Sequence, residues 1–277
     1  MDKKTRRVSA AVFAAVIAAL LIGIFLTAHG GDKEPIQEVM RDAVLHEHDR
    51  VSLFGLVDVN PGLIAAFSTT ALLFVFALIV RIFVIPRFTL HPGRFQMLLE
   101  QAVGLFDGLA RSNSPHRNGF LGVYVFSAGT YIFVSTLLEM FGIQAVTAAG
   151  RPVSLPAPLS DINGAIAMGV MSYLVILIGG LVGGGAKGAL NALKDFSLPI
   201  SMSFRLFGAL LSGALVTELV YASMGLSFGL PVFVGVMFTL LHAVIQAYVL
   251  TMLTAMFYGE SSEPSKKTGK KPKHRKA

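Results

Sequence analysis

The 277-residue sequence contains no cysteine, and only 14% of its residues are charged. The lack of cysteine excludes disulfide bonds and cysteine-ligated metal sites. The scarcity of charge argues against a water-soluble domain, in which about a quarter of the residues are charged. Hydrophobic residues make up 54% of the chain, and the mean hydropathy is +0.68. This composition indicates that lipid is the main solvent.

Several long stretches contain no Asp, Glu, Lys or Arg. They are Val8–Ala28, Pro61–Val80, Gly164–Leu181 and Pro231–Phe257. Each is near or above the ~18–20 apolar residues that cross a ~30 Å hydrocarbon core. Because lipid cannot satisfy backbone hydrogen bonds, such segments form helices, and the alternating pattern of membrane β-strands is absent. We expect an all-α integral membrane protein with five to six transmembrane helices.

The basic residues predict the orientation of these helices. Seven Lys and Arg residues lie between Lys266 and Lys276, as many as the net charge of +7. Beside a last span, such a run is typical of a cytoplasmic tail near anionic lipid, and no aromatic or fold signal favours nucleic-acid binding. Alternating spans then place every basic cluster on the inner side. The expected organisation is a signal peptide or first span over 1–28, an extracytoplasmic segment over 29–60, a membrane domain over 61–258 and a basic cytoplasmic tail over 259–277.

One predicted helix differs from the spans. In Pro92–Arg111 apolar side chains recur on one face, whereas Gln96, Glu100 and Asp107 lie on the opposite face. This amphipathic pattern indicates a helix that lies along the inner membrane interface.

Arg205 is the outstanding charge within an apolar segment. A charge at mid-membrane depth costs between about 3 and more than about 10 kcal/mol, so it is a functional candidate. At 100° per residue, Ser201, Gly208, Ala209 and Ser212 share its helix face. These small residues would let another helix approach and leave the guanidinium accessible. The alternative is an arginine that extends to the inner surface or is neutralised by an internal acid.

Three acids are candidates for an ion path toward the outer half of the membrane: Glu139, Asp161 and Glu218. Asn163 is expected either to line this path or to hold a helix terminus. On the last span His242 and Gln246 lie one turn apart, and His242 serves either as a proton relay or as a packing residue.

No cofactor is expected. The run His46-Glu47-His48-Asp49 could ligate a metal, but no further ligand is evident, which favours a solvated loop.

Short motifs follow one another between about Asn60 and Tyr258. They are Pro92-Gly93-Arg94-Phe95-Gln96 with Glu100, Leu137-Leu138-Glu139-Met140, Pro158-Leu159-Ser160-Asp161-Ile162-Asn163, Ser203-Phe204-Arg205-Leu206-Phe207-Gly208 and Gln246-Ala247-Tyr248. In this order they resemble the a subunit of F-type ATP synthases, part of the F0 sector. The Arg-Leu-Phe-Gly element followed by Gln-Ala is the most specific part.

The resemblance implies a non-catalytic, ion-translocating subunit, with protons as the expected ion. It implies two long tilted helices against a ring of c subunits, two offset half-channels, and the b-subunit stator and F1 head as partners in a bacterial plasma membrane. Arg205 would match the essential arginine of the family and Gln246 the glutamine facing it. Glu139, Asp161 and Asn163 match polar positions of the outer half-channel.

The sequence departs from the family pattern at three usually polar positions, which are Ala209, Ala214 and Thr239. Glu218 and His242 lie about one turn or less from the last two, so we expect them to take their place.

An ion-coupled secondary transporter is the alternative class, because it would use the same intramembrane charges. Such folds commonly contain inverted repeats, and no internal repeat is evident in the sequence.

Overall fold

The computed structural model of the protein describes residues 22, 51–53, 57–116, 119–141, 144–146, 152–222 and 230–263. Except for Ile22, the hydrophobic segment expected over 1–28 lies outside the described residues. Most of the segment 29–60, including His46–Asp49, and the tail beyond residue 263 lie outside them as well.

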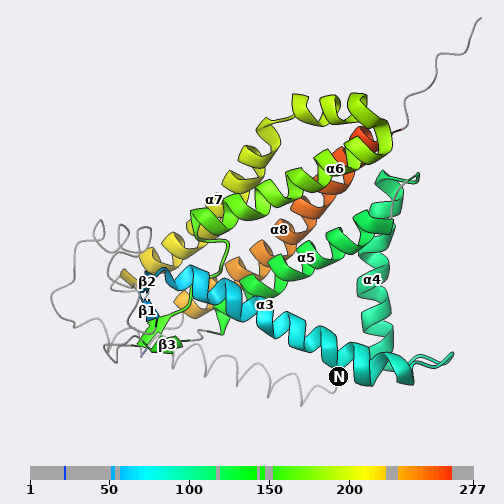
Figure 1. Ribbon diagram of the computed structural model, residues 1–277. Coiled ribbons are helices and arrows are strands. Elements are labelled where there is room, and N and C mark those ends of the chain that lie inside the picture. Colours follow the sequence, from blue (N-terminus) through cyan, green and yellow to red (C-terminus); the bar gives the residue numbers. More distant parts are fainter. Residues whose placement is uncertain are drawn as a thin grey trace, which may run out of the picture. The chain divides into compact units, whose positions relative to one another are not determined.

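Long helices dominate the described chain (Figure 1). They are α3 (Pro61–Ile79), α4 (Arg94–Asn113), α5 (Gly119–Met140), α6 (Ile162–Lys194), α7 (Ser197–Ala222) and α8 (Leu230–Ser262). Among the described residues, four stretches are long and apolar enough to cross a membrane: Pro61–Arg87, Gly119–Met140, Ile162–Lys194 and Val232–Ser262. The all-α membrane fold is confirmed, whereas the number of spans stays a prediction.

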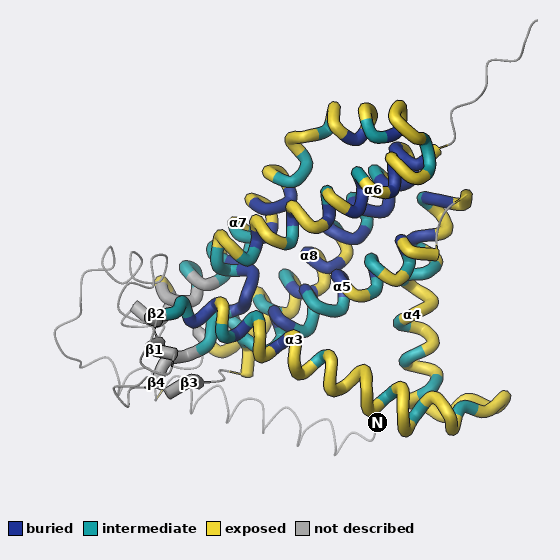
Figure 2. Tube along the Cα trace, in the orientation of Figure 1, coloured by how far each residue is buried: buried dark blue, intermediate teal, exposed yellow. Residues whose placement is uncertain are grey.

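The helix after Pro61 extends beyond the regular α-helical part. It continues through the π-helical segment η1 (Val80–Val84) and the 3-10 turn η2 (Ile85–Arg87), where Pro86 cannot donate a backbone hydrogen bond. Most residues beyond Thr70 are exposed in this stretch (Figure 2), although their side chains are mostly apolar. Exposed apolar side chains along a span are suited to contact with lipid.

Two short antiparallel ladders accompany the helices and were not predicted. Strands β1 (Val51–Leu53) and β2 (Val57–Val59) pair with each other, and β3 (Gln144–Val146) pairs with β4 (Pro152–Ser154). Each strand has three residues, which is too short for an alternating pattern to be recognised in the sequence.

The described residues belong to two compact units. One draws on Met1–Leu72, Ile132–Gly164 and Arg205–Ile245, and the other on Leu73–Tyr131, Ala165–Phe204 and Gln246–Ala277. Six of the seven candidate site residues fall in the first unit, whereas Gln246 falls in the second.

Within the second unit, α6 contains a glycine-rich turn. Gly185 has φ 63° and ψ −147°, a conformation that residues with a Cβ rarely adopt. After this turn the helix returns alongside its first arm. The Tyr173 hydroxyl of the first arm donates a hydrogen bond to the Ala192 carbonyl of the second arm at 3.1 Å. A Cβ at Gly180 would lie only 2.8 Å from the carbonyl oxygen of Gly188. The absence of side chains therefore allows the two arms to meet backbone to backbone.

The end of α8 packs against this hairpin. Tyr258 lies against Gly179, and Ser262 lies against Gly183. Ser261 and Ser262 are buried, and α8 is helical up to Ser262. The sequence predicted that this span ends at Tyr258. The contact with the hairpin joins segments that are distant in the sequence, so it leaves no local signal from which the longer helix could be predicted.

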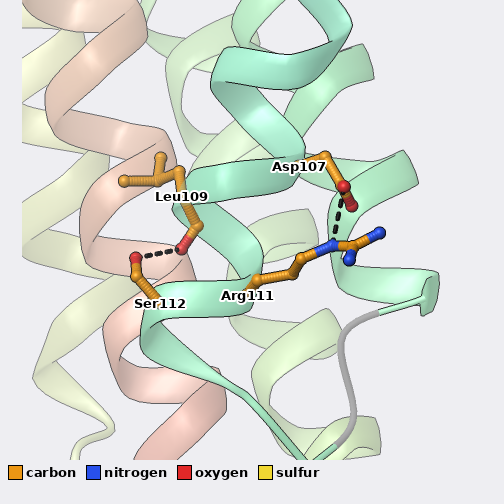
Figure 3. A network of polar contacts seen from close by, with 4 residues as sticks. All are labelled: Asp107, Leu109, Arg111 and Ser112. Carbon is orange, nitrogen blue, oxygen red and sulfur yellow. Dashed lines mark hydrogen bonds and ion pairs between the residues drawn. The ribbon is translucent and has the colours of Figure 1, made fainter.

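The amphipathic helix α4 also belongs to the second unit. Phe106 contacts Phe126 of α5 edge to face at 5.8 Å, and Ala110 is fully buried. On its polar face, Asp107 and Arg111 form a 2.7 Å ion pair one turn apart (Figure 3). The predicted division into an apolar and a polar face is thus present around these residues, whereas its position at the inner interface stays a prediction.

Candidate functional site

The face of α7 around Arg205 is open. Ser201, Arg205, Gly208 and Ser212 are exposed and Ala209 is half-buried. The adjoining side of the helix is closed, and its buried residues recur at helical spacing: Met202, Ser203, Leu206 and Leu210.

The guanidinium of Arg205 has no partner within the described part of the chain. It forms no salt bridge or hydrogen bond there, and a Cβ built on Gly208 would meet no atom within 4 Å. The alternative of neutralisation by an internal acid finds no support among the described residues. The arrangement is suited to a negative group presented by another molecule, because arginine offers five donors in a fixed geometry.

Gln246 is a buried residue of α8. Its Oε1 is buried and accepts no hydrogen bond from any described residue. An unsatisfied buried polar group costs about 1–3 kcal/mol, so this oxygen is suited to accept a hydrogen bond from water or from a group outside the described chain.

His242 belongs to α8 and, among the described residues, is hydrogen-bonded through one ring nitrogen only. Its Nδ1 lies 2.8 Å from the Phe238 carbonyl oxygen, and its ring stacks on Phe238 with centroids 5.7 Å apart. A carbonyl oxygen only accepts hydrogen bonds, so Nδ1 donates and carries the proton. In the neutral ring Nε2 is then left as an acceptor, and no described residue bonds to it.

Two of the candidate acids lie on α5 and α7. Glu139 is half-buried in the last turn of α5, and its carboxyl group forms no hydrogen bond or ion pair with another described residue. Glu218 belongs to α7, but its side chain lies outside what the structure describes. Helix α7 approaches His242 at Gly213, where a Cβ would lie 3.9 Å from Nδ1.

Asp161 and Asn163 lie together at the start of α6. Asp161 Oδ1 accepts hydrogen bonds from the Asn163 backbone N–H at 2.9 Å and from its side-chain amide at 3.2 Å. This is the geometry of a helix N-cap. Asn163 thus lies in the first turn of α6 and Asp161 is the cap, whereas a role of Asn163 in the ion path stays a prediction.

The sequence interpretation missed Asn60, which joins this group. Its side-chain amide donates to Asp161 Oδ2 at 2.6 Å, across 101 positions of sequence. The tripeptide Asn60-Pro61-Gly62 could have indicated a helix start, since Asn favours the N-cap and Pro the first helical position. No local signal could have indicated the contact with Asp161.

The structure therefore brings Asp161 and Asn163 together and adds Asn60. Arg205, Glu139 and His242 are in the same unit as these residues, but no described hydrogen bond or ion pair joins them to one another.

These features define a multi-pass helical membrane protein with an exposed cation, carboxyl groups and a histidine on its helices. Residues 64–259 match the ATP synthase A chain family. This match covers more than half of the chain, and the protein belongs to that family. It is thus a component of the ion-translocating F0 sector of ATP synthase, which separates it from the secondary transporters considered as the alternative.

Proposed function

We propose that the chain forms two offset half-channels against the rotating c ring and couples proton flow to rotation. The observation that carries this proposal is the open face of α7, on which Arg205 is exposed and has no partner among the residues that the structure describes. A carboxylate of a c subunit would meet the guanidinium after losing its proton, as the ring turns.

A permanently charged residue is required at this point. Arginine side chains stay protonated in proteins, whereas a buried lysine can become neutral. A fixed cation stabilises the deprotonated c-subunit carboxylate and opposes the passage of a protonated one. Protons would otherwise cross without turning the ring.

The proposed outer half-channel uses Glu139, Asp161, Asn163, Glu218 and His242. In this proposal His242 Nε2 takes a proton from the outer side and passes it on, while Nδ1 remains on the Phe238 carbonyl. Gln246 would contact the ion path near Arg205 through its Oε1, which accepts no hydrogen bond from a described residue. The chain itself breaks no covalent bond of a substrate, so it is a channel subunit rather than an enzyme.

The remaining parts of the proposal concern the assembly. The b-subunit stator and the F1 head are proposed as partners, and a bacterial plasma membrane as the location. The C-terminus is proposed to be cytoplasmic, because seven basic residues lie between Lys266 and Lys276.

A photoreactive cysteine reagent can test the open face, because the chain contains no cysteine of its own. The reagent is attached to Ser212→Cys, which is on the exposed face, and to Leu210→Cys, which is on the buried face. After illumination of the assembled complex, the cross-linked partner is identified by mass spectrometry. We expect c subunit on Ser212→Cys and only the chain itself on Leu210→Cys. Capture of no c subunit at position 212 would reject the proposal.

A further inference from the structure

The junction between the starts of α3 and α6 contains a residue with no role in the scheme above. We infer that Asn60 is a positioning residue for the outer half-channel, which fixes the orientation of the Asp161 carboxyl group through its side-chain amide. This inference rests on the proposed role of Asp161 in the outer path.

On the α3 side, Asn60 is held by its own helix. Its Oδ1 accepts the Gly62 backbone N–H at 2.9 Å, and Pro61 occupies the first helical position, so Asn60 is the N-cap of α3. Since Oδ1 must accept from that N–H, the NH₂ end of the amide is the end directed at Asp161. The carboxylate, in turn, can only accept.

On the α6 side, the two oxygens of Asp161 have different surroundings. Oδ1 takes both hydrogen bonds from Asn163, whereas among the described residues Oδ2 takes a single one, from Asn60 at 2.6 Å. Asp161 forms no salt bridge with any described residue. A carboxylate oxygen has two acceptor sites, so Oδ2 keeps one site at which a proton or a water molecule can bind. Asn60 thus contacts the oxygen that is available for exchange.

Gly62 makes this contact sterically possible. A Cβ at position 62 would lie 3.2 Å from the Asp161 Cβ and 3.3 Å from its Oδ2, which is tighter than ordinary packing. Without a side chain there, α3 can bring its cap to the carboxyl group directly. The two helix starts are therefore joined through one amide and one carboxylate.

Asn60→Ser separates capping from positioning. Serine is as good an N-cap as asparagine, so the start of α3 is retained, but the shorter side chain has no amide to reach Asp161. The assembled ATP synthase is reconstituted in inverted membrane vesicles, and ATP-driven proton pumping is measured as a function of pH. We expect wild-type assembly, several-fold slower pumping and a changed pH profile. Asp161→Asn combined with Asn60→Ser should be no slower than Asp161→Asn alone, because both changes act on one group.

Asn60→Asp keeps the test decisive if the serine variant assembles poorly. Aspartate also caps a helix, and it places a second carboxyl group against Asp161, where like charges favour a shared proton. Pumping should then change its pH dependence toward the alkaline side. An unchanged pH profile in both variants would overturn the inference even if the rate fell, because a purely structural effect lowers the rate alone. Unimpaired pumping by Asp161→Asn would instead reject the role of Asp161 in the outer path.

Discussion

Glycine serves opposite purposes in the α6 hairpin and on the open face of α7. In the hairpin, a Cβ at Gly188 would lie 2.6 Å from the Ser261 carbonyl oxygen and would overlap that of Gly180. On α7, a Cβ at Gly208 would meet nothing within 4 Å. The space beside Gly188 is filled by backbone atoms of the same chain. The glycine beside Arg205 leaves room that the described chain does not use.

The difference separates residues that hold the subunit together from residues that meet a partner. Overpacking of a closed contact destabilises the fold, whereas a change on an open face leaves it intact. Variants in the hairpin should therefore reduce the amount of assembled protein, whereas replacement of Arg205 on the open face should reduce pumping alone.

The largest effect is expected for Arg205→Ala. This change removes the fixed cation and should abolish ATP-driven pumping. The amount of assembled complex should stay at the wild-type level, because Arg205 is exposed and bonds to none of the described residues. Pumping in inverted vesicles and co-purification of the complex measure the two quantities. Ser201→Ala, on the same exposed face, is the uncharged control and should pump normally. Normal pumping by Arg205→Ala would contradict the proposed mechanism.

Arg205→Lys should be severely impaired although it keeps a positive charge. The ammonium group lacks the planar fork of arginine and can lose its proton when desolvated. A hydrogen bond to a charged group contributes about 1.5–3 kcal/mol, and about 1.4 kcal/mol corresponds to a factor of ten, so we expect pumping to fall about tenfold or more. Rates are compared in vesicles with equal amounts of complex. Full coupling in this variant would show that a point charge is sufficient.

Gly188→Ala should act on assembly instead. The added methyl group meets backbone atoms of Gly180 and Ser261, which cannot move as freely as the end of a side chain. Overpacking of this kind typically costs about 1–3 kcal/mol, so we expect a several-fold lower yield of complex and a lower thermal midpoint. Gly208→Ala is the matched control and should assemble like the wild type. Equal yields of the two variants would remove the distinction between the closed and the open glycines.

The sequence predicted most of the helices, because long charge-free stretches and the amphipathic pattern of α4 are local signals. It also predicted the open face around Arg205 from small residues at helical spacing. The extension of α8 to Ser262 and the contact between Asn60 and Asp161 were not predictable. Both depend on segments distant in the sequence, and Asn60 lies 101 positions from its partner.

The smallest effects are expected for Glu218 and His242. They lie on α7 and α8, which approach each other at Gly213 less tightly than the two arms of the hairpin do. A Cβ at Gly213 would be in ordinary contact with His242, 3.9 Å from Nδ1. Nε2 is the ring nitrogen left to exchange protons, since Nδ1 is bound to the Phe238 carbonyl.

We predict that Glu218 and His242 form a relay pair, so that Glu218→Gln and His242→Ala each slow pumping several-fold. If both residues lie on one path, the double variant should be about as slow as the slower single variant, because either change already interrupts the path. Independent roles would make the two effects multiply. Unchanged pumping in both single variants would eliminate the relay and leave Glu139 and Asp161 as the outer acids.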